Sequence, residues 1–193
     1  MGARGREAAS VGVLSFALET PRLLLRPCTA ADVDALHALW TDASVRRWLW
    51  DDVVIERATA AEVVAASEAS FAARGYGQWC IALREAEGLA GFAGLREIGD
   101  TPEVEVLYGF LPVHWGRGLA TEAARAVLAH GFDTVGLARI AGRTDTPNSA
   151  SARVLERIGM TFEGEWPDNE LPTVHYSLTR EAFARSPSGT LAS

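Results

Sequence analysis

The sequence predicts a single α/β domain of the α+β kind, built on a mixed, mostly antiparallel β-sheet with helices on both faces. Three observations indicate this fold class. Segments of strand character alternate with segments of helical periodicity. Three consecutive strand segments are joined by short turns, and short turns require antiparallel pairing. From the third of these strands onward the chain reads strand, helix, strand, helix, strand, strand, which excludes a doubly wound parallel sheet.

Length and hydrophobicity fit one globular domain, which we expect over residues 19–185. In 193 residues two independent domains would be cramped, and the hydrophobic fraction of 48% is that of a packed core. No apolar run approaches the roughly 20 residues of a membrane span, and the start of the chain lacks the pattern of a signal peptide. We expect residues 1–18 to be a flexible lead-in and residues 186–193 a loose tail.

Cysteine usage and charge narrow the class of protein. Cys28 and Cys80 are too few for a disulfide framework and have no metal-ligand spacing, so we expect a reduced, cytoplasmic protein without a metal or a membrane partner. The net charge of −7 argues against a general nucleic-acid binder and favours a cationic or amine partner. Since every basic residue is arginine, no lysine is present for Schiff-base chemistry.

The first third predicts one strand followed by helices. Residues 20–26 read as a strand that ends at Pro27. Thr29 and Asp32 have capping-box spacing, so a helix is expected over 30–41, with a second short helix over 43–49. Thr59 and Glu62 repeat the capping spacing before a helix over 59–73, which stops at Arg74-Gly75.

The remaining segments complete the sheet. Strands are expected over 78–84, 89–98 and 103–111, joined by turns at 85–88 and 99–102. A helix over 119–135, a strand over 138–144 and a helix over 148–158 follow. The last two strands are expected over 161–166 and 173–179.

A glycine pair lies where the strand over 103–111 gives way to the helix over 119–135. Gly116 and Gly118 permit backbone conformations that a side chain would block. The free N–H groups at the start of the helix then form an anion site, and a phosphate is the expected occupant. The stretch lacks the Lys-Ser/Thr ending of a nucleoside-triphosphate loop and the third glycine of a dinucleotide loop. Any strand-to-helix connection also favours glycine, so this pair alone is compatible with a simple turn.

Four stretches in order at the expected spacing resemble the GNAT superfamily of N-acetyltransferases, within it the branch of ribosomal-protein N-terminal acetyltransferases (RimJ/RimL-like) and their small-molecule relatives. They are Thr20-Pro-Arg-Leu-Leu-Leu-Arg-Pro27, the segment from Glu105 to Ala123, the segment from Arg139 to Met160, and Val174-His-Tyr-Ser-Leu178. The resemblance covers about residues 19–183. Trp115 departs from the Gln or Arg that usually opens the glycine motif, which matters little for a loop acting through backbone N–H groups.

The resemblance implies a splayed central strand pair, with acetyl-coenzyme A as co-substrate in the gap. Its pyrophosphate would rest on the glycine turn, and its acetyl carbonyl would accept a backbone N–H near Phe110 as oxyanion donor. The implied cofactor-binding residues are Phe110, Leu111, Trp115, Gly116, Arg117, Gly118, Leu119, Ala120, Thr121, Asn148 and Ser151.

The same resemblance implies the catalytic groups. Glu105 would take the amine proton, directly or through a water, with Glu103 as a reserve on the same strand face. Asn148 would contact the pantetheine region, and Ser151 would protonate the thiolate. The spacing of these two residues also fits a helix cap, Glu105 also fits a salt-bridged strand residue, and Tyr108 and Tyr176 are alternative hydroxyls.

The acceptor side is less defined. Trp48, Trp50, Asp51 and Tyr108 are expected to contact the acceptor, although core packing is the more common explanation for such tryptophans. The acceptor would be a protein N-terminus or a small-molecule amine such as an amino acid derivative, a polyamine or an amine antibiotic. A homodimer stays open, and so does a non-catalytic acyl-coenzyme A sensor with the same fold.

Overall fold

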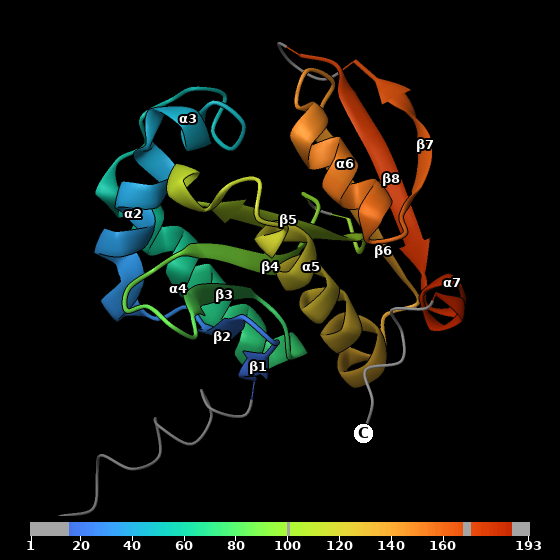
Figure 1. Cartoon of the computed structure of the whole chain (residues 1–193), viewed down its shortest axis with the longest axis horizontal. Helices are drawn as coiled ribbons and strands as arrows, with labels where there is room; N and C mark the ends of the chain where they lie inside the picture. The colour runs from blue at the N-terminus through green and yellow to red at the C-terminus, as the bar shows by residue number, and fades with distance from the viewer. Residues whose placement is uncertain (1–15, 100, 168–170, 187–193) are drawn as a thin grey trace, which may run out of the picture.

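The computed structural model describes residues 16–99, 101–167 and 171–186. Its strands form an eight-stranded sheet in the order β1-β2-β3-β4-β5-β6-β8-β7 (Figure 1). The strands are β1 (Leu18–Glu19), β2 (Leu23–Pro27), β3 (Gln78–Leu83), β4 (Gly91–Glu97), β5 (Val104–Phe110), β6 (Arg139–Asp145), β7 (Thr161–Trp166) and β8 (Thr173–Thr179).

Apart from α7, the helices occur in the predicted order along the chain. They are the 3₁₀ turn η1 (Ala30–Asp32), α2 (Val33–Thr41), α3 (Ala43–Arg46), α4 (Arg57–Arg74), the 3₁₀ turn η2 (Pro112–His114), α5 (Leu119–Ala129), the π-helical turn η3 (His130–Val135), α6 (Ser149–Arg157) and α7 (Arg180–Arg185). None of the helices in the described residues is long and apolar enough to cross a membrane.

All strand pairs are antiparallel except β5 and β6, which are parallel and touch at one register pair, Glu105 and Ala141. Beyond that pair the two strands diverge, and Figure 1 shows the gap between the half containing β4 and α3 and the half containing β8 and α6. The mixed sheet and its splayed central pair are therefore confirmed.

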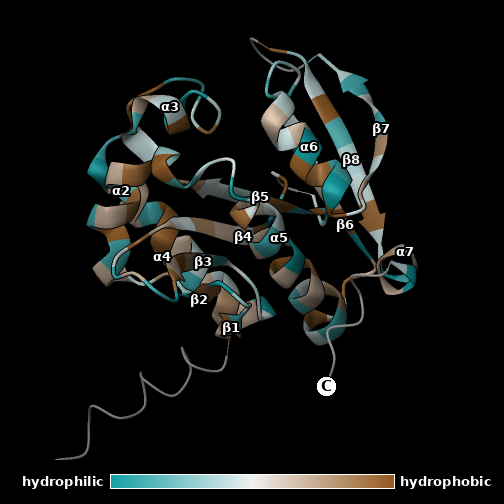
Figure 2. Ribbon diagram, viewed as in Figure 1, coloured by the Kyte–Doolittle hydropathy of each residue, from teal (hydrophilic) through white to brown (hydrophobic). Residues whose placement is uncertain are grey.

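Two buried clusters lie on the sheet. One joins β2–β6 to α5 and α6, and the other joins the inner faces of α2 and α4 to Cys28, Cys80 and Phe92. Figure 2 shows hydrophobic residues on the sheet-facing sides of the helices. Because side chains alternate along β5, Val106 and Tyr108 belong to the first cluster and Leu107 to the second. The two faces of β5, beside the gap, therefore carry different side chains.

Three local expectations differ from the structure. The helix expected to start at Thr59 begins at Arg57 with Glu56 as its N-cap, so Thr59 lies inside the helix. Helix α7 was not expected; it is capped by the Thr179 side chain, which accepts from Ala182 N. Phe16 and Leu18, placed in the flexible lead-in, pack against the core. The rest of that lead-in, residues 1–15, and the tail 187–193 lie outside the described residues.

Candidate active site

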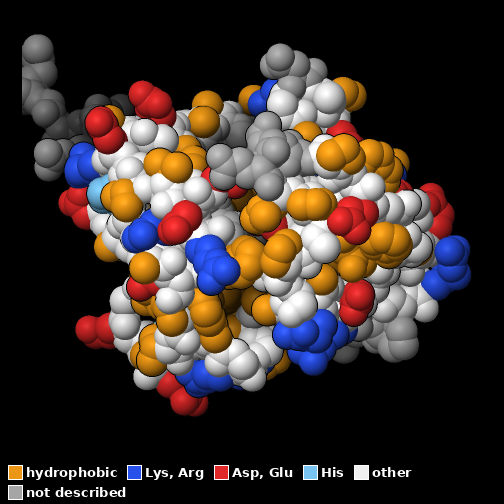
Figure 3. All heavy atoms as spheres, turned by 90° about the horizontal axis from the view of Figure 1, so that it is seen from above, with side chains coloured by type: hydrophobic (Ala, Val, Ile, Leu, Met, Phe, Trp, Pro, Cys, Tyr) orange, Lys and Arg blue, Asp and Glu red, His pale blue; other side chains and the backbone are white. Residues whose placement is uncertain are grey.

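A cleft of about 560 Å³ opens where β5 and β6 diverge. Its walls come from α3 and the loop after it, the length of β5, the glycine turn with the start of α5, and the end of β6 with the start of α6. Figure 3 looks onto the end of the molecule where α3 and α6 lie, and it shows hydrophobic side chains and arginines around a central hollow.

The glycine turn forms one end of this cleft. Gly116 and Gly118 have φ values of 73° and 74°, in the left-handed region that favours glycine. Gly118 is the N-cap of α5, and the first turn of that helix lines the cleft. The free N–H groups of the helix start are thus next to the cleft, as an anion site requires.

A network of polar contacts that the sequence analysis missed holds the glycine turn in place. Arg22 donates to the carbonyl oxygen of Arg117 at 2.9 Å and to Glu122 at 2.6 Å. The Thr20 hydroxyl also donates to Glu122, at 2.6 Å. The turn between β1 and β2 therefore holds the loop that ends at Gly118.

Backbone groups of β5 face the gap. Leu111 N donates to Ala90 O at 3.0 Å, and bonding direction alternates along an antiparallel strand. The N–H groups of Tyr108 and Phe110 consequently point away from β4, towards the splay. The Phe110 carbonyl on that side accepts a bond from Trp115 Nε1 at 2.7 Å, so the indole anchors the glycine turn to the strand.

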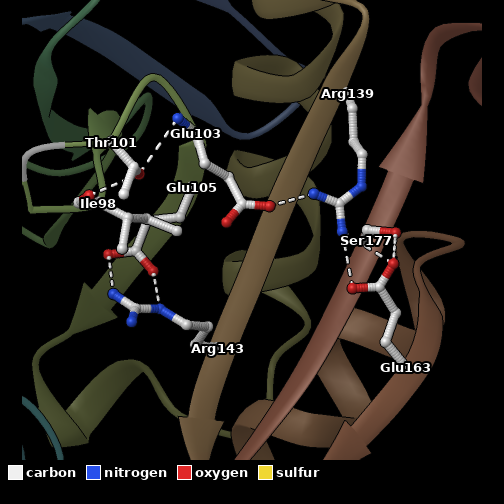
Figure 4. A network of polar contacts seen from close by, with 8 residues as sticks. All are labelled: Ile98, Thr101, Glu103, Glu105, Arg139, Arg143, Glu163 and Ser177. Atoms are coloured by element: carbon white, nitrogen blue, oxygen red, sulfur yellow. Dashed lines mark hydrogen bonds and ion pairs between the residues drawn. The ribbon is translucent and has the colours of Figure 1, made fainter.

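Glu105 lies at the closed end of the splay, and only 4% of the residue is exposed. Arg143 of β6 donates from Nε to Oε2 at 2.8 Å and from Nη2 to Oε1 at 3.1 Å (Figure 4). Arg96, its cross-strand neighbour on β4, donates from Nε to Oε1 at 2.8 Å. One carboxylate therefore ties three strands together at the point where β5 and β6 separate.

These contacts determine the ionisation of Glu105. Burial alone would raise its pKa, but the hydrogen bond from Arg143 and the positive charges of Arg96 and Arg143 outweigh burial and lower the pKa below its ordinary value. The group is a carboxylate at neutral pH. Both arginines were missed as site residues, although antiparallel register could have suggested Arg96.

Glu103 occupies a different environment. It precedes β5 and forms an ion pair with Arg139, which also pairs with Glu163 (Figure 4). Glu103 is not among the residues that line the cleft. The structure therefore favours Glu105 over Glu103 as the carboxylate available to the cleft.

Helix α6 begins at the opposite wall. Asn148 caps it by accepting from Ser151 N at 3.2 Å, and both residues line the cleft. The Ser151 hydroxyl lies 3.0 Å from the Tyr108 hydroxyl, which is also 3.1 Å from the Ser151 carbonyl oxygen. Tyr108 is thus placed with the α6 wall, and not beside the tryptophans with which it was grouped.

The residues expected on the acceptor wall do not all lie at the cleft. Trp48 and Asp51 line the cleft, and Asp51 has a φ of 52°, a strained value for a non-glycine residue. Trp50 does not line it; its ring packs edge-on against Trp40 at 6.0 Å. Core packing therefore explains Trp50.

Most of the other expected residues meet at this one cleft. Those that line it are Glu105, Tyr108, Phe110, Trp115, Gly116, Gly118, Leu119, Ala120, Thr121, Asn148, Ser151, Trp48 and Asp51. Leu111, Arg117 and Trp50 are outside this set. Within the part of the chain that the structure describes, no group of three His, Cys, Asp or Glu side chains could hold a metal ion.

Comparisons with known proteins show what the chain and its fold are similar to. The family model described as "Acetyltransferase (GNAT) domain" matches residues 22–161. The chain is 30% identical over 148 residues to the uncharacterized N-acetyltransferase YoaA of Bacillus subtilis, covering 76% of this chain and 84% of that protein. An acetyltransferase from Agrobacterium tumefaciens superposes with a TM-score of 0.74 at 28% identity, over 84% of this chain and 93% of that chain.

A more distant neighbour supports the fold. RimL, a ribosomal L7/L12 alpha-N-protein acetyltransferase in complex with coenzyme A, has a TM-score of 0.74 at 20% identity. The match covers 86% of this chain and 99% of that chain.

Proposed function

The chain belongs to the GNAT acetyltransferase family, and we propose that it transfers an acetyl group from acetyl-coenzyme A to a primary amine by direct attack within a ternary complex. The observation that carries this proposal is the cleft between β5 and β6, with the start of helix α5 at one end and a buried carboxylate at the other. A donor with a phosphate end and a reactive thioester end suits such a cleft.

The glycine turn supports the position proposed for the donor. Its pyrophosphate would accept hydrogen bonds from the backbone N–H groups of residues 116–121, among them those of Arg117 and Ala120. The pantetheine arm would lie along β5 as an added strand would. It would accept a hydrogen bond from the backbone N–H of Tyr108 or Phe110, which points away from β4. RimL holds coenzyme A on the same fold.

Glu105 is the proposed proton acceptor. A carboxylate with a lowered pKa is a weak base towards a free ammonium group, whose pKa is about 8 to 10. As the new C–N bond forms, however, the attached N–H becomes strongly acidic, so a weak base or a water held by it suffices. The reserve role of Glu103 is weaker because that side chain is outside the cleft.

The remaining roles follow the same geometry. Phe110 N–H is the proposed oxyanion donor, and Asn148 both caps α6 and borders the thioester region. Ser151 is the proposed hydrogen-bond donor to the departing thiolate. Trp48 and Asp51 are the proposed acceptor contacts; the strained backbone of Asp51 at the cleft rim fits a functional position.

The second function that this fold supports is a non-catalytic sensor of acyl-coenzyme A. It would need the glycine turn but not Glu105 or Ser151. The burial of Glu105 at the cleft floor and the position of Ser151 on its wall favour an enzyme.

An acceptor panel separates the two functions. Thiol release from acetyl-coenzyme A is measured with N-terminal peptides, amino acid derivatives, polyamines and an amine antibiotic, and the acetylated product is identified by mass spectrometry. We expect turnover with one acceptor class and its loss in Glu105→Gln. Tight binding of acetyl-coenzyme A with no release for any acceptor would instead support the sensor.

A further inference from the structure

The Tyr108 side chain reaches α6 from the face of β5 that packs in the first cluster. Strand alternation directs it away from Glu105 and into the cluster under α5 and α6. Its hydroxyl is 3.0 Å from Ser151 Oγ and 3.1 Å from Ser151 O, so both of its recorded partners belong to one residue.

The proton count at this contact allows two arrangements. A phenol has one proton, while the Ser151 hydroxyl and carbonyl offer two acceptors. In the first arrangement Tyr108 donates to the carbonyl and the serine hydroxyl donates to the phenol oxygen. In the second, Tyr108 donates to Ser151 Oγ, and the serine proton is directed elsewhere in the cleft.

We propose that Tyr108 is a positioning residue for the reaction, and that its O–H donates to Ser151 Oγ so that the serine proton points at the departing sulfur. This inference rests on the proposed acetyl transfer. Ser151 is held from both sides, because its N–H donates to Asn148 Oδ1 at 3.2 Å while its side chain meets Tyr108.

The chemistry requires a donor that stays protonated. When the C–S bond breaks, its electron pair goes to sulfur, and the thiolate accepts a hydrogen bond from Ser151. A hydroxyl that itself accepts a hydrogen bond is a stronger donor. The proton that finally neutralises the thiolate is the one that the amine loses, delivered through solvent, so Tyr108 and Ser151 are unchanged at the end. Burial raises the pKa of the Tyr108 phenol, which keeps its proton in place.

A double-mutant cycle tests this role. Tyr108→Phe, Ser151→Ala and the double variant are compared by kcat, with the Kd for coenzyme A and the melting temperature measured on the same preparations. We expect Tyr108→Phe to lower kcat about tenfold with little change in Kd, which is about 1.4 kcal/mol of transition-state stabilisation. The double variant should be no slower than Ser151→Ala alone.

Two results would overturn the inference while leaving acetyl transfer intact. One is an unchanged kcat in Tyr108→Phe; the other is a double variant whose loss equals the product of the single losses. A wild-type protein that acetylates no acceptor would remove the proposed function and this inference with it. Should Tyr108→Phe fail to fold, 3-fluorotyrosine at position 108 keeps the shape and alters donor strength. Its effect on kcat should vanish in Ser151→Ala, and an equal effect in both backgrounds would contradict the proposal.

Discussion

Glu105 combines a structural task with the proposed chemical one in a single side chain. Glu105 is the one β5 residue that pairs with a residue of β6, Ala141. Its carboxylate forms ion pairs with Arg96 of β4 and Arg143 of β6, so it links three strands. The same carboxylate lies on the cleft floor. Replacing it should therefore affect both the free energy of unfolding and catalysis.

Glu105→Gln and Glu103→Gln form a matched pair. Loss of the Glu105 charge leaves two arginines facing a neutral amide, and we expect a stability loss of about 1–3 kcal/mol, moderated because the Arg96 side chain is 55% exposed. We expect kcat to fall about a hundredfold or more. Glu103→Gln, at an exposed pair, should change stability by less than about 1 kcal/mol and kcat by less than about twofold. Equal losses in the two variants, measured by denaturation and thiol release, would contradict these roles.

The pH dependence of stability has a definite sign. Since folding lowers the pKa of Glu105, its contribution to stability is complete above the unfolded value of about 4.3 and is lost as the pH falls through the folded value. The stability difference between wild type and Glu105→Gln should therefore shrink below about pH 4. A difference that grows under acid conditions would show that the pKa is raised instead.

At the scale of elements, sequence periodicity predicted most of the structure. The strands over 161–166 and 173–179 have the predicted bounds, and the Thr29–Asp32 capping box is present. Thr59 was misread because a capping motif is short and recurs inside helices. The order β6-β8-β7 depends on long-range pairing that periodicity does not encode.

The site residues also divide into those set by local sequence and those set by long-range packing. The glycine turn and the Asn148 cap are local features, so the sequence predicts them. Arg143 is 38 residues from Glu105, and Tyr108 is 43 residues from Ser151. Contacts over such separations are set by the packing of β5, β6 and α6, and no short motif reports them.

The position of α6 depends on Gly142 of β6. A Cβ atom there would lie 2.7 Å from Leu155 Cδ2 and 2.8 Å from Met160 Sδ, so these two buried side chains, one in α6 and one just after it, would have to shift. We expect Gly142→Ala to cost about 1–3 kcal/mol in chemical denaturation and to lower kcat, because α6 carries Asn148 and Ser151. Gly99→Asn is the control, since a Cβ atom at Gly99 meets nothing within 4 Å and asparagine tolerates its left-handed φ of 54°. Unchanged stability in Gly142→Ala would show that the close contact between β6 and α6 is not needed.

For the whole molecule, the two halves of the sheet meet at one register pair and separate from there. The cleft follows from that separation, with the glycine turn on one half and the Ser151 helix on the other. A ligand that bridges both halves should stabilise the native state, because it binds only when they are correctly placed. Donor binding can therefore be measured without knowledge of the acceptor.

Thermal unfolding with acetyl-coenzyme A is the most direct test of the central claim that this cleft holds the acetyl donor. At a hundredfold excess over Kd the wild type should gain about 2.7 kcal/mol, which corresponds to a rise in melting temperature of about 5–10 °C for a chain of this size. Gly118→Asn, which accepts a left-handed backbone, should retain the rise, and Gly118→Val should lose it. A wild-type melting temperature that acetyl-coenzyme A does not change, or an equal rise in Gly118→Val, would contradict the account.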